Sequence, residues 1–171
     1  MKSAILILLG SLLVGCSTEA PNPTKKYSSP KAKKAQRSVH ADFQSNQGGY
    51  CEFQDKTILV ELKPNGAGEF IACSDYTIQK DGVVSSGRPG THDTVRGDFR
   101  TQWKAYKWDS KKYPSDNKGS YNMKRAQFFH GGFAIHNGNV NGLSHGCVRT
   151  QMVNADWLYE WAPVGARIII I

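Results

Sequence analysis

The sequence predicts a mainly β domain with mostly antiparallel strands, one short helix and one long loop. Three observations favour this class. Short runs rich in β-branched and aromatic residues alternate with turn signals made of Gly, Pro, Asn and Asp. Only one segment has the spacing of an amphipathic helix, and no internal repeat is present. The domain spans about residues 41–171, which is enough for one substantial hydrophobic core.

Several strands are expected in the first part of the domain. KTILVELK (residues 56–63) is rich in β-branched residues and alternates imperfectly, which predicts a half-buried strand. PNG (64–66) predicts a turn, and EFIACSDYTIQ (69–79) predicts the next strand. KDG (80–82) is a hairpin signal that leads into a further strand at VVSSG (83–87).

A long loop is expected in the middle of the domain. GRPG (87–90) interrupts the strands, and GDF (97–99) predicts the start of another short strand. Residues 101–127 mix aromatic, Lys and turn residues without a sustained period, and a loop of this length usually forms a lid or a binding loop. The aromatic residues expected to fasten it to the body are Trp103, Tyr106, Trp108, Tyr113 and Tyr121.

The last third is expected to hold a strand, a turn, the helix and a closing strand. FFHGGFAIH (128–136) has the composition of a strand, and NGNVNGL (137–143) predicts a turn. NADWLYEW (154–161) predicts a short helix that PVG (163–165) ends, and RIIII (167–171) predicts a buried strand. The expected face of the helix comprises Val153, Trp157 and Trp161, with Thr150 or Asn154 near its cap.

Residues 1–15 have the pattern of a signal peptide. Lys2 supplies a positive start, and an apolar run too short to span a bilayer follows up to Cys16. The run ends in LVGC (13–16), which resembles the lipobox of bacterial lipoproteins. This resemblance implies cleavage before Cys16, a lipid on its sulfur and acylation of the new amino terminus, so that acyl chains anchor the protein to a membrane. A short transmembrane segment or a leader with an incidental cysteine is the alternative.

Residues 16–40 begin with Cys16 and continue with Pro, Ser, Lys and Ala, which predicts a flexible basic tether with a span on the order of 25–30 Å. Seven of the 22 basic residues and one of the 14 acidic residues lie in residues 1–40, so this part carries +6 of the net charge of +8. The domain at 41–171 carries only +2, which argues against nucleic acid as a partner.

The three other cysteines of an exported chain meet an oxidising exterior. Cys51 and Cys73 would close a disulfide worth roughly 3 kcal/mol by loop-closure arguments, or they would be two buried free thiols. In either case Cys147 is left over, and a lone thiol in an exported protein needs an explanation. It is either a packing thiol or a nucleophile.

The residues around Cys147 favour a nucleophile. A thiol attacks a carbonyl carbon only as the thiolate, so it needs a base or a positive charge beside it. His145 would share a face with Cys147 in an extended chain, and His136 would approach from the preceding strand. Gly146 permits a close approach of the backbone, and its amide and that of Cys147 are candidates for an oxyanion hole. A metal site made of these two histidines and the cysteine is disfavoured, because their spacing fits no common zinc motif.

The segment IHNGNVNGLSHGCVR (135–149) resembles the active-site signature of L,D-transpeptidase catalytic domains of the YkuD type. In that signature a histidine follows a short strand, and Ser/Thr-His-Gly-Cys, an apolar residue and Arg or Asn follow after a loop. VSSGRPG (84–90) and TVRGDF (94–99) loosely resemble the upstream pattern of the family. The resemblance covers most of residues 50–171 and implies the β-sandwich-like fold of these enzymes.

Position by position, the resemblance implies that Cys147 is the nucleophile and His136 its general base, although proximity in sequence alone favours His145. The backbone carbonyl of Asn137 would orient His136, as a carboxylate does in other triads. The remaining matched residues would line the site (His145), stabilise the oxyanion (Gly146 with Cys147), and brace the loop or contact substrate (Ser144 and Arg149).

The resemblance implies a lipid-anchored, cysteine-dependent L,D-transpeptidase that acts on peptidoglycan stem peptides without a cofactor or metal. A thioester acyl-enzyme would pass its acyl group to an amine of another stem, which forms a cross-link. With water as the acceptor the same site would be a carboxypeptidase or a hydrolase, and a non-catalytic wall-binding lipoprotein is the alternative from another class. The protein would face the cell wall in the periplasm, and Ser17 after Cys16 favours the outer membrane.

Overall fold

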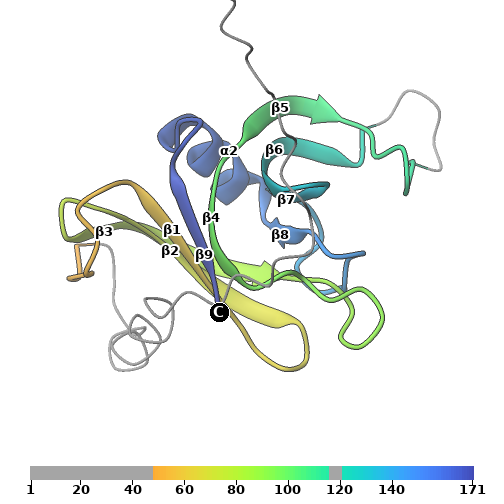
Figure 1. The fold of residues 1–171 in the computed structure, drawn as a ribbon, viewed down its shortest axis with the longest axis horizontal. Helices are drawn as coiled ribbons and strands as arrows, with labels where there is room; N and C mark the ends of the chain where they lie inside the picture. The colour runs from red at the N-terminus through yellow and green to blue at the C-terminus, as the bar shows by residue number, and fades with distance from the viewer. Residues whose placement is uncertain (1–47, 116–120) are drawn as a thin grey trace, which may run out of the picture.

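Within the residues that the structure describes, the strands form one curled sheet to which one helix is added (Figure 1). A computed structural model describes residues 48–115 and 121–171; the predicted signal peptide, Cys16 and the tether up to residue 40 lie outside the described residues. The described elements are β1 (Thr57–Leu62), β2 (Ala67–Ser74), β3 (Thr77–Ser85), β4 (Gly97–Arg100), β5 (Trp103–Trp108), β6 (Met123–His130), β7 (Phe133–Asn137), β8 (Val148–Thr150), α2 (Met152–Trp161) and β9 (Arg167–Ile170).

The nine described strands are arranged in the order β4-β9-β1-β2-β3-β8-β7-β6-β5. Neighbours are antiparallel except for two parallel pairs, β1 with β9 and β7 with β8. The prediction of a mainly β, mostly antiparallel domain with one short helix is therefore confirmed for the described part of the chain. The strands predicted at GDF and at RIIII are β4 and β9.

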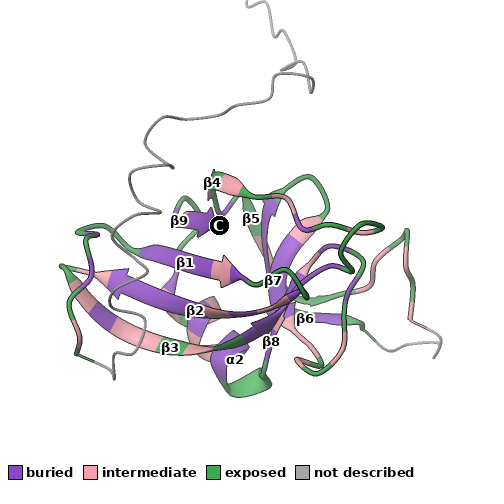
Figure 2. Ribbon diagram, turned by 90° about the horizontal axis from the view of Figure 1, so that it is seen from below, coloured by how far each residue is buried: buried purple, intermediate pink, exposed green. Residues whose placement is uncertain are grey.

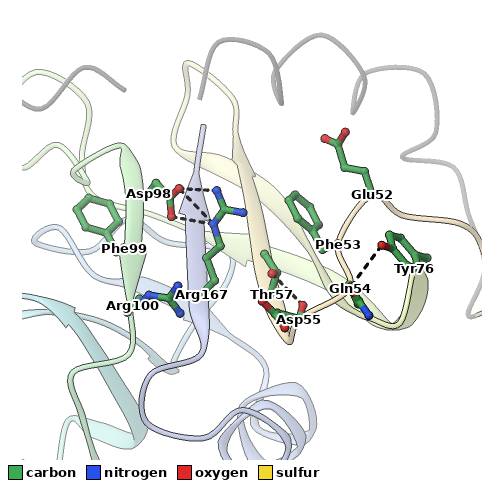
Figure 3. A pocket seen from close by; sticks show the side chains of 10 residues that line it. All are labelled: Glu52, Phe53, Gln54, Asp55, Thr57, Tyr76, Asp98, Phe99, Arg100 and Arg167. Carbon is green, nitrogen blue, oxygen red and sulfur yellow. Dashed lines mark hydrogen bonds and ion pairs between the residues drawn. The ribbon is translucent and has the colours of Figure 1, made fainter. Parts of the chain in front are cut away.

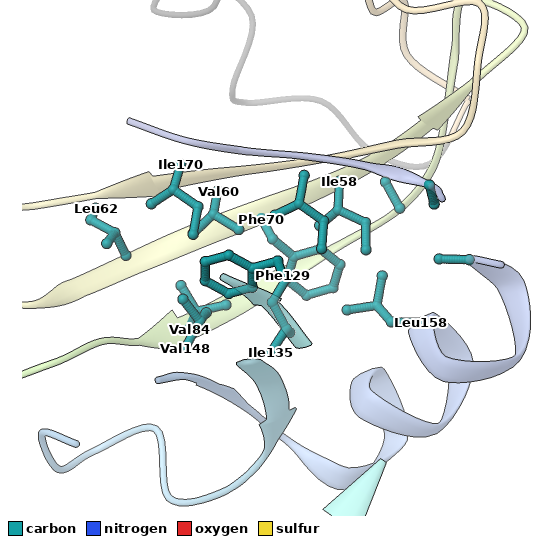
Figure 4. Close-up of a cluster of buried hydrophobic side chains, with 14 residues drawn as sticks. Ile58, Val60, Leu62, Phe70, Val84, Phe129, Ile135, Val148, Leu158 and Ile170 are labelled. Atoms are coloured by element: carbon teal, nitrogen blue, oxygen red, sulfur yellow. The ribbon is translucent and has the colours of Figure 1, made fainter. Parts of the chain in front are cut away.

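The main core lies on the inner face of the curl, between its two halves. Strands β1, β2 and β9 lie opposite β6, β7 and β8, and α2 closes the side between them (Figure 4). Figure 2 shows that the middle of each of these strands is buried. The largest side chains of this core are Ile58, Val60, Phe70, Phe129, Ile135, Val148, Leu158, Ile168 and Ile170.

The outer face of the curl carries two smaller apolar clusters. One lies over β1, β2, β3 and β9, and residues 50–56 run across it; we call this the covered outer face. Its cluster comprises Cys51, Phe53, Leu59, Ile71, Cys73, Ile78 and Ile169. The other lies over β5, β6 and β7, and we call it the open outer face. Its cluster comprises Met123, Ala126, Phe128 and Ala134, against which Ala105 and Cys147 pack.

The covered outer face explains why one prediction for β1 was wrong. The sequence predicts a half-buried strand, but Thr57, Ile58, Leu59 and Val60 are all buried. Ile58 and Val60 point into the main core, whereas Leu59 points into the outer cluster. A strand that is apolar on both faces alternates poorly, and this is the imperfect alternation seen in the sequence.

The hairpin predicted at residues 80–82 is also wrong, because these residues lie inside β3. The turn between β2 and β3 is instead made by Asp75 and Tyr76, whose φ angles are 51° and 61°. Both residues therefore occupy the left-handed conformation that tight hairpins require. Gly82 serves packing rather than turning, because a Cβ there would lie 2.8 Å from the ring of Phe70.

The predicted loop at 101–127 is shorter than expected. Residues 103–108 form β5, and β6 begins at Met123, so that the connection covers 109–122, of which 116–120 are outside the described residues. β5 is an edge strand, and its lysines and half-exposed aromatic residues mask the period of a strand.

The helix α2 is where the sequence predicts it, but it buries a different face. Asn154, Ala155 and Leu158 are buried, whereas Val153 is 64% exposed. Trp157 and Trp161 are half-buried and pack against the core. The N-cap is Gln151, which makes no side-chain cap bond, and the Asn154 amide donates to Thr150 Oγ1 at 3.4 Å.

Candidate active site

The parallel pairing of β7 and β8 brings the predicted site residues together. Ile135 pairs with Val148, and both point into the main core. Side chains alternate along a strand, so the residues on either side of this pair point to the open outer face. Three residues therefore lie on one face and line the same cleft: His136 of β7, Arg149 of β8, and Cys147 immediately before β8.

The turn that presents Cys147 is held by Ser144. The hydroxyl of Ser144 donates to the Cys147 carbonyl at 2.6 Å and accepts from the Gly146 amide at 3.0 Å. Gly146 has φ +121°, and a Cβ there would lie 2.6 Å from the Phe133 ring, so only glycine fits this position. Ser144 thus braces the loop, one of the two roles predicted for it. The Gly146 amide, predicted in the oxyanion hole, is already engaged by this hydroxyl.

A buried threonine fixes the same turn from a remote segment. The Thr94 hydroxyl donates to the Gly146 carbonyl at 2.7 Å and accepts from the Gly87 amide at 2.9 Å. Thr94 is 8% exposed, so this bridge is shielded from water. No role was predicted for Thr94, although the residue belongs to the upstream segment TVRGDF that resembles the family pattern.

His136 is held in one tautomer by its own backbone neighbour. Its Nδ1 lies 2.6 Å from the Asn137 carbonyl, which only accepts, so Nδ1 carries the proton and Nε2 has a free lone pair. The side chain is 5% exposed. Burial lowers the pKa of His136 to about 4, the bond to Asn137 opposes this shift, and the charge of Arg149 adds to it. The ring is therefore neutral at pH 7.

Cys147 is in a setting that favours the neutral thiol. Burial raises the pKa of the Cys147 thiol, whereas the Ala134 backbone and the charge of Arg149 oppose this shift. The sulfur donates to the Gly132 carbonyl at 3.7 Å. A neutral thiol beside a neutral imidazole suits transfer of the thiol proton during attack rather than a preformed ion pair.

Arg149 ties the loop after His136 to the sheet. One of its terminal nitrogens donates to the Gly142 carbonyl, and its stem packs against Gly138. Its Nε is buried and has no hydrogen-bond partner among the described residues. Arg149 therefore braces this loop and keeps one donor unused beside the cleft.

His145 is placed differently from His136. Its ring stacks on Tyr113 at a centroid distance of 4.1 Å and meets the edge of His92 at 4.7 Å. The pKa of His145 is lowered, mainly by loss of solvent around the ring. The neighbouring charges of His92, Arg88, Arg149 and Lys112 lower it further. The ring thus joins the turn before Cys147 to residues from two other loops, and His145 lines the cleft as predicted. The contact with Tyr113 was missed because nothing local in the sequence connects the two.

The cleft that contains these groups has a volume of about 860 Å³. Its floor is the open outer face, and its walls come from residues 110–115 and 138–145. Part of the predicted lid-like loop is thus a wall of the site. Among the described residues, no three His, Cys, Asp or Glu side chains are grouped so that they could hold a metal ion.

A second cavity, of about 670 Å³, lies on the covered outer face (Figure 3). Its main charges are already paired, because the Arg167 guanidinium donates to both oxygens of Asp98, at 2.9 Å from Nε and 2.5 Å from Nη2. Its lining contains neither cysteine nor histidine. Close by, Cys51 and Cys73 are joined in a disulfide with their Cα atoms 6.4 Å apart.

The described helix is too short and too polar to cross a membrane, and no other helix occurs in 48–115 or 121–171. The predicted anchor at Cys16 lies outside these residues.

Comparison with solved structures shows the same fold in L,D-transpeptidases. One from Stackebrandtia nassauensis aligns with a TM-score of 0.60 and 23% identity over 80% of this chain and 63% of that one. One from Xylanimonas cellulosilytica aligns at 0.58 and 22% identity over 81% and 69%. An LD transpeptidase in complex with imipenem aligns at 0.55 and 20% identity over 68% and 59%. The chain thus spans less than two thirds of the first and third of these proteins.

Comparison with curated proteins finds no match. The sequence does match a family, YkuD, described as the L,D-transpeptidase catalytic domain, over residues 55–170. This range contains every strand and the helix described above, as well as the cleft residues. The chain therefore belongs to the YkuD family of L,D-transpeptidase catalytic domains.

Proposed function

We propose that the protein is a peptidoglycan L,D-transpeptidase whose nucleophile is Cys147 and whose general base is His136. The observation that carries this proposal is the arrangement on β7 and β8: a thiol and a neutral imidazole of defined tautomer share one face and line one cleft. The membership of the YkuD family supports the same reaction.

In the proposed reaction, Nε2 of His136 takes the proton of the Cys147 thiol as the sulfur attacks the carbonyl of the third stem residue. The tetrahedral intermediate collapses, the bond to the following D-residue breaks, and the leaving amine takes the proton back from His136. A thioester acyl-enzyme remains. Asn137 keeps Nδ1 protonated throughout, so that the ring acts at Nε2 only.

The oxyanion is expected at the Cys147 amide. The Gly146 amide joins it only if Ser144 gives up the bond that it accepts at 3.0 Å. Arg149 lines the cleft, where its positive charge favours a carbonyl or carboxylate of the stem peptide. These residues position the substrate and stabilise charge, whereas Cys147 and His136 carry out the bond exchange.

The acyl group then passes to an amine of a second stem, and a cross-link forms. The experiment that tests this is incubation of the full-length chain with purified disaccharide-tetrapeptides, followed by mass spectrometry. A dimer lighter than two monomers by one free alanine supports transpeptidation. Monomers that have lost alanine without forming dimers would show that water is the acceptor, and unchanged substrate would contradict the proposal.

A second test examines the nucleophile without the natural substrate. Imipenem contains a strained lactam carbonyl, and a similar LD transpeptidase has been solved in complex with it. We expect one equivalent of imipenem to add covalently to the wild-type chain and none to add to Cys147→Ala, as judged by intact mass. Addition to the alanine variant would assign the reactive group elsewhere.

We further propose that the chain is exported and anchored in a membrane through lipid on Cys16, with a preference for the outer membrane. The LVGC segment after an apolar run supports this proposal. Cells fed labelled palmitate should incorporate it into the wild-type protein and not into Cys16→Ala. Equal labelling of both would contradict the anchor and leave the transpeptidase proposal untouched.

A further inference from the structure

The open outer face continues beyond the catalytic cleft to the edge of the sheet. Val148 pairs with Ile135, so Cys147 lies beside Ala134 of β7. Ala134 pairs with Phe128 of β6, and Phe128 pairs with Trp103 of β5. The register therefore places these four residues in one row across four strands, with the thiol at one end and an indole at the other.

The far end of this row is an aromatic shelf, which we define as Trp103, Trp108 and Phe128. Trp103 stacks on Phe128 with the ring centroids 3.6 Å apart and the planes at 8°, and Trp108 meets Trp103 edge-on at 5.1 Å. Phe128 is 2% exposed, whereas Trp103 and Trp108 keep 38% and 36% of their surface in solvent. Two half-exposed indoles on an edge strand carry a cost in solubility, which points to a ligand.

The shelf and the cleft share one apolar floor. Phe128 belongs to the same cluster as Met123, and Met123 lines the cleft. Cys147 and Ala105 pack against that cluster. A substrate whose reacting bond lies at Cys147 therefore reaches the shelf without leaving the surface of the sheet.

The three rings of the shelf offer flat apolar surface. Two lysines of β5 have partners elsewhere, and the amine of one of them, Lys107, lies over the Tyr121 ring at 5.7 Å. Lys104 of β5 is bound by α2, where its amine donates to the carbonyls of Tyr159 and Ala162. On the same face of the sheet, the residues next to the shelf are Ala105 of β5 and Ala126 of β6, which pair with each other. Such a surface suits a neutral ring with one apolar face, and the C–H face of an N-acetylated amino sugar has this character.

The length of the row matches the distance from the reacting bond to the sugar of the substrate. Three strand spacings separate Cys147 from Trp103, which is roughly 14 Å. Three stem residues in an extended conformation cover about 10–11 Å. The short linker that joins the first stem residue to its sugar then covers the few ångströms that remain.

We propose that the shelf binds an amino-sugar ring of the glycan strand that carries the acyl-donor stem, so that the protein selects glycan-attached stems over free peptides. This inference rests on the proposed function, because it assumes that the stem's third residue is acylated at Cys147. The stem then crosses β7 and β6, and the sugar stacks on the indoles of Trp103 and Trp108.

The test compares two donors with the full-length chain: a tetrapeptide attached to its disaccharide, and the same tetrapeptide without sugar. The wild type should show kcat/KM about tenfold higher for the sugar-bearing donor, which corresponds to one good aromatic stacking contact. Trp103→Leu and Trp108→Leu keep apolar cover over Phe128 and remove a flat ring, and each should bring this ratio close to one. Tyr50→Leu removes an aromatic residue that is 68% exposed on the other half of the sheet, and its ratio should equal that of the wild type.

Equal kcat/KM for the two donors in the wild type would overturn the proposal. So would leucine variants that lower both rates by the same factor, because that result assigns the indoles to the fold or to an apolar protein partner. If no donor is turned over, the proposed function fails, and the shelf is tested by binding alone. The disaccharide of the donor, without its peptide, is then titrated into the full-length chain. Quenching of tryptophan fluorescence that Trp103→Leu abolishes supports the shelf, and absence of saturable quenching overturns it.

Discussion

The two outer faces of the curled sheet differ in what lies over them. On the covered outer face, residues 50–56 and the Cys51–Cys73 disulfide lie over the apolar cluster, and the cavity at its margin contains an Asp98–Arg167 ion pair. On the open outer face, no comparable segment among the described residues covers the strands next to Cys147. That face keeps a thiol, a neutral imidazole and an unpaired guanidinium nitrogen.

This difference shows how one sheet separates stability from chemistry. Groups that are paired and covered lower the free energy of the folded state and have no capacity left for a ligand. Groups that remain unpaired in a cleft cost stability, and they persist where they bind or react. Substitutions on the open face should therefore change activity, and those on the covered face should change the free energy of unfolding.

The largest effect is expected at Cys147. Cys147→Ala removes the proposed nucleophile and should lower kcat by at least about 10⁴-fold, with little change in Tm because the side chain lies at the rim of its apolar cluster. The measurements are product formation by mass spectrometry and thermal unfolding of the same sample. Retained turnover would remove Cys147 from the mechanism.

His136→Gln should lower kcat by about 10²–10⁴-fold, because glutamine cannot accept the thiol proton. His145→Gln is the matched control, since His145 stacks on Tyr113 and should affect KM more than kcat. Separate determination of kcat and KM for both variants distinguishes the two histidines. A greater loss of kcat in His145→Gln would exchange their roles.

The buried His136 should also make stability depend on pH. Its pKa falls from 6.5 to about 4 on folding, so the unfolded chain binds the proton at higher pH than the folded chain. The neutral ring makes its full contribution to the free energy of unfolding above pH 6.5. This contribution, about 3 kcal/mol, is lost as the pH falls from 6.5 through 4. Urea unfolding of the wild type and His136→Gln between pH 7 and 4 measures this, and the variant should show a smaller loss over that range. If the free energy of unfolding fell equally with pH in the wild type and in His136→Gln, this prediction would be wrong.

On the covered face, replacing Cys51 and Cys73 together by alanine should cost about 3 kcal/mol of unfolding free energy, because the loop of the unfolded chain is no longer closed. The kcat of the folded variant should equal that of the wild type. Chemical denaturation and steady-state kinetics on one preparation test both parts. A fall in kcat larger than twofold would show that the two faces are coupled.

The smallest effect is expected for Asp98→Asn. The ion pair with Arg167 is partly exposed, and such pairs contribute at most about 1 kcal/mol. Raising the ionic strength should narrow the gap in Tm between wild type and variant, since salt screens the pair in the wild type only. A gap that is independent of salt would show that the contribution is not electrostatic.

The sequence predicted the proximity of His136 and Cys147 better than the elements around them. The two residues were singled out because they flank one short loop and match a specific signature, and the structure places both on one cleft. Thr94 was assigned no role, and Tyr113 was expected only to fasten its loop to the body. Both residues meet the turn before Cys147 only through the curl of the sheet. Such contacts depend on register, which a single sequence does not reveal.

Among the strands, those with buried apolar runs or clear turns were predictable. β9 consists of RIII and is buried after its first residue. β5 was missed because this edge strand does not show the regular alternation of apolar and polar residues. The β2–β3 turn was misplaced because Asp75 and Tyr76 turn the chain without glycine. Gly82 resembles a turn residue in the sequence, but its role is to make room for Phe70.

The position of β9 also constrains when the domain becomes native during synthesis. β9 is made after every other described strand, yet it lies between β4 and β1 in the sheet. Until it is made, β4 has no strand partner and β1 exposes one edge to solvent. A ribosome-bound chain that lacks β9 therefore cannot complete its sheet, and the native fold is reached only after these residues leave the ribosome.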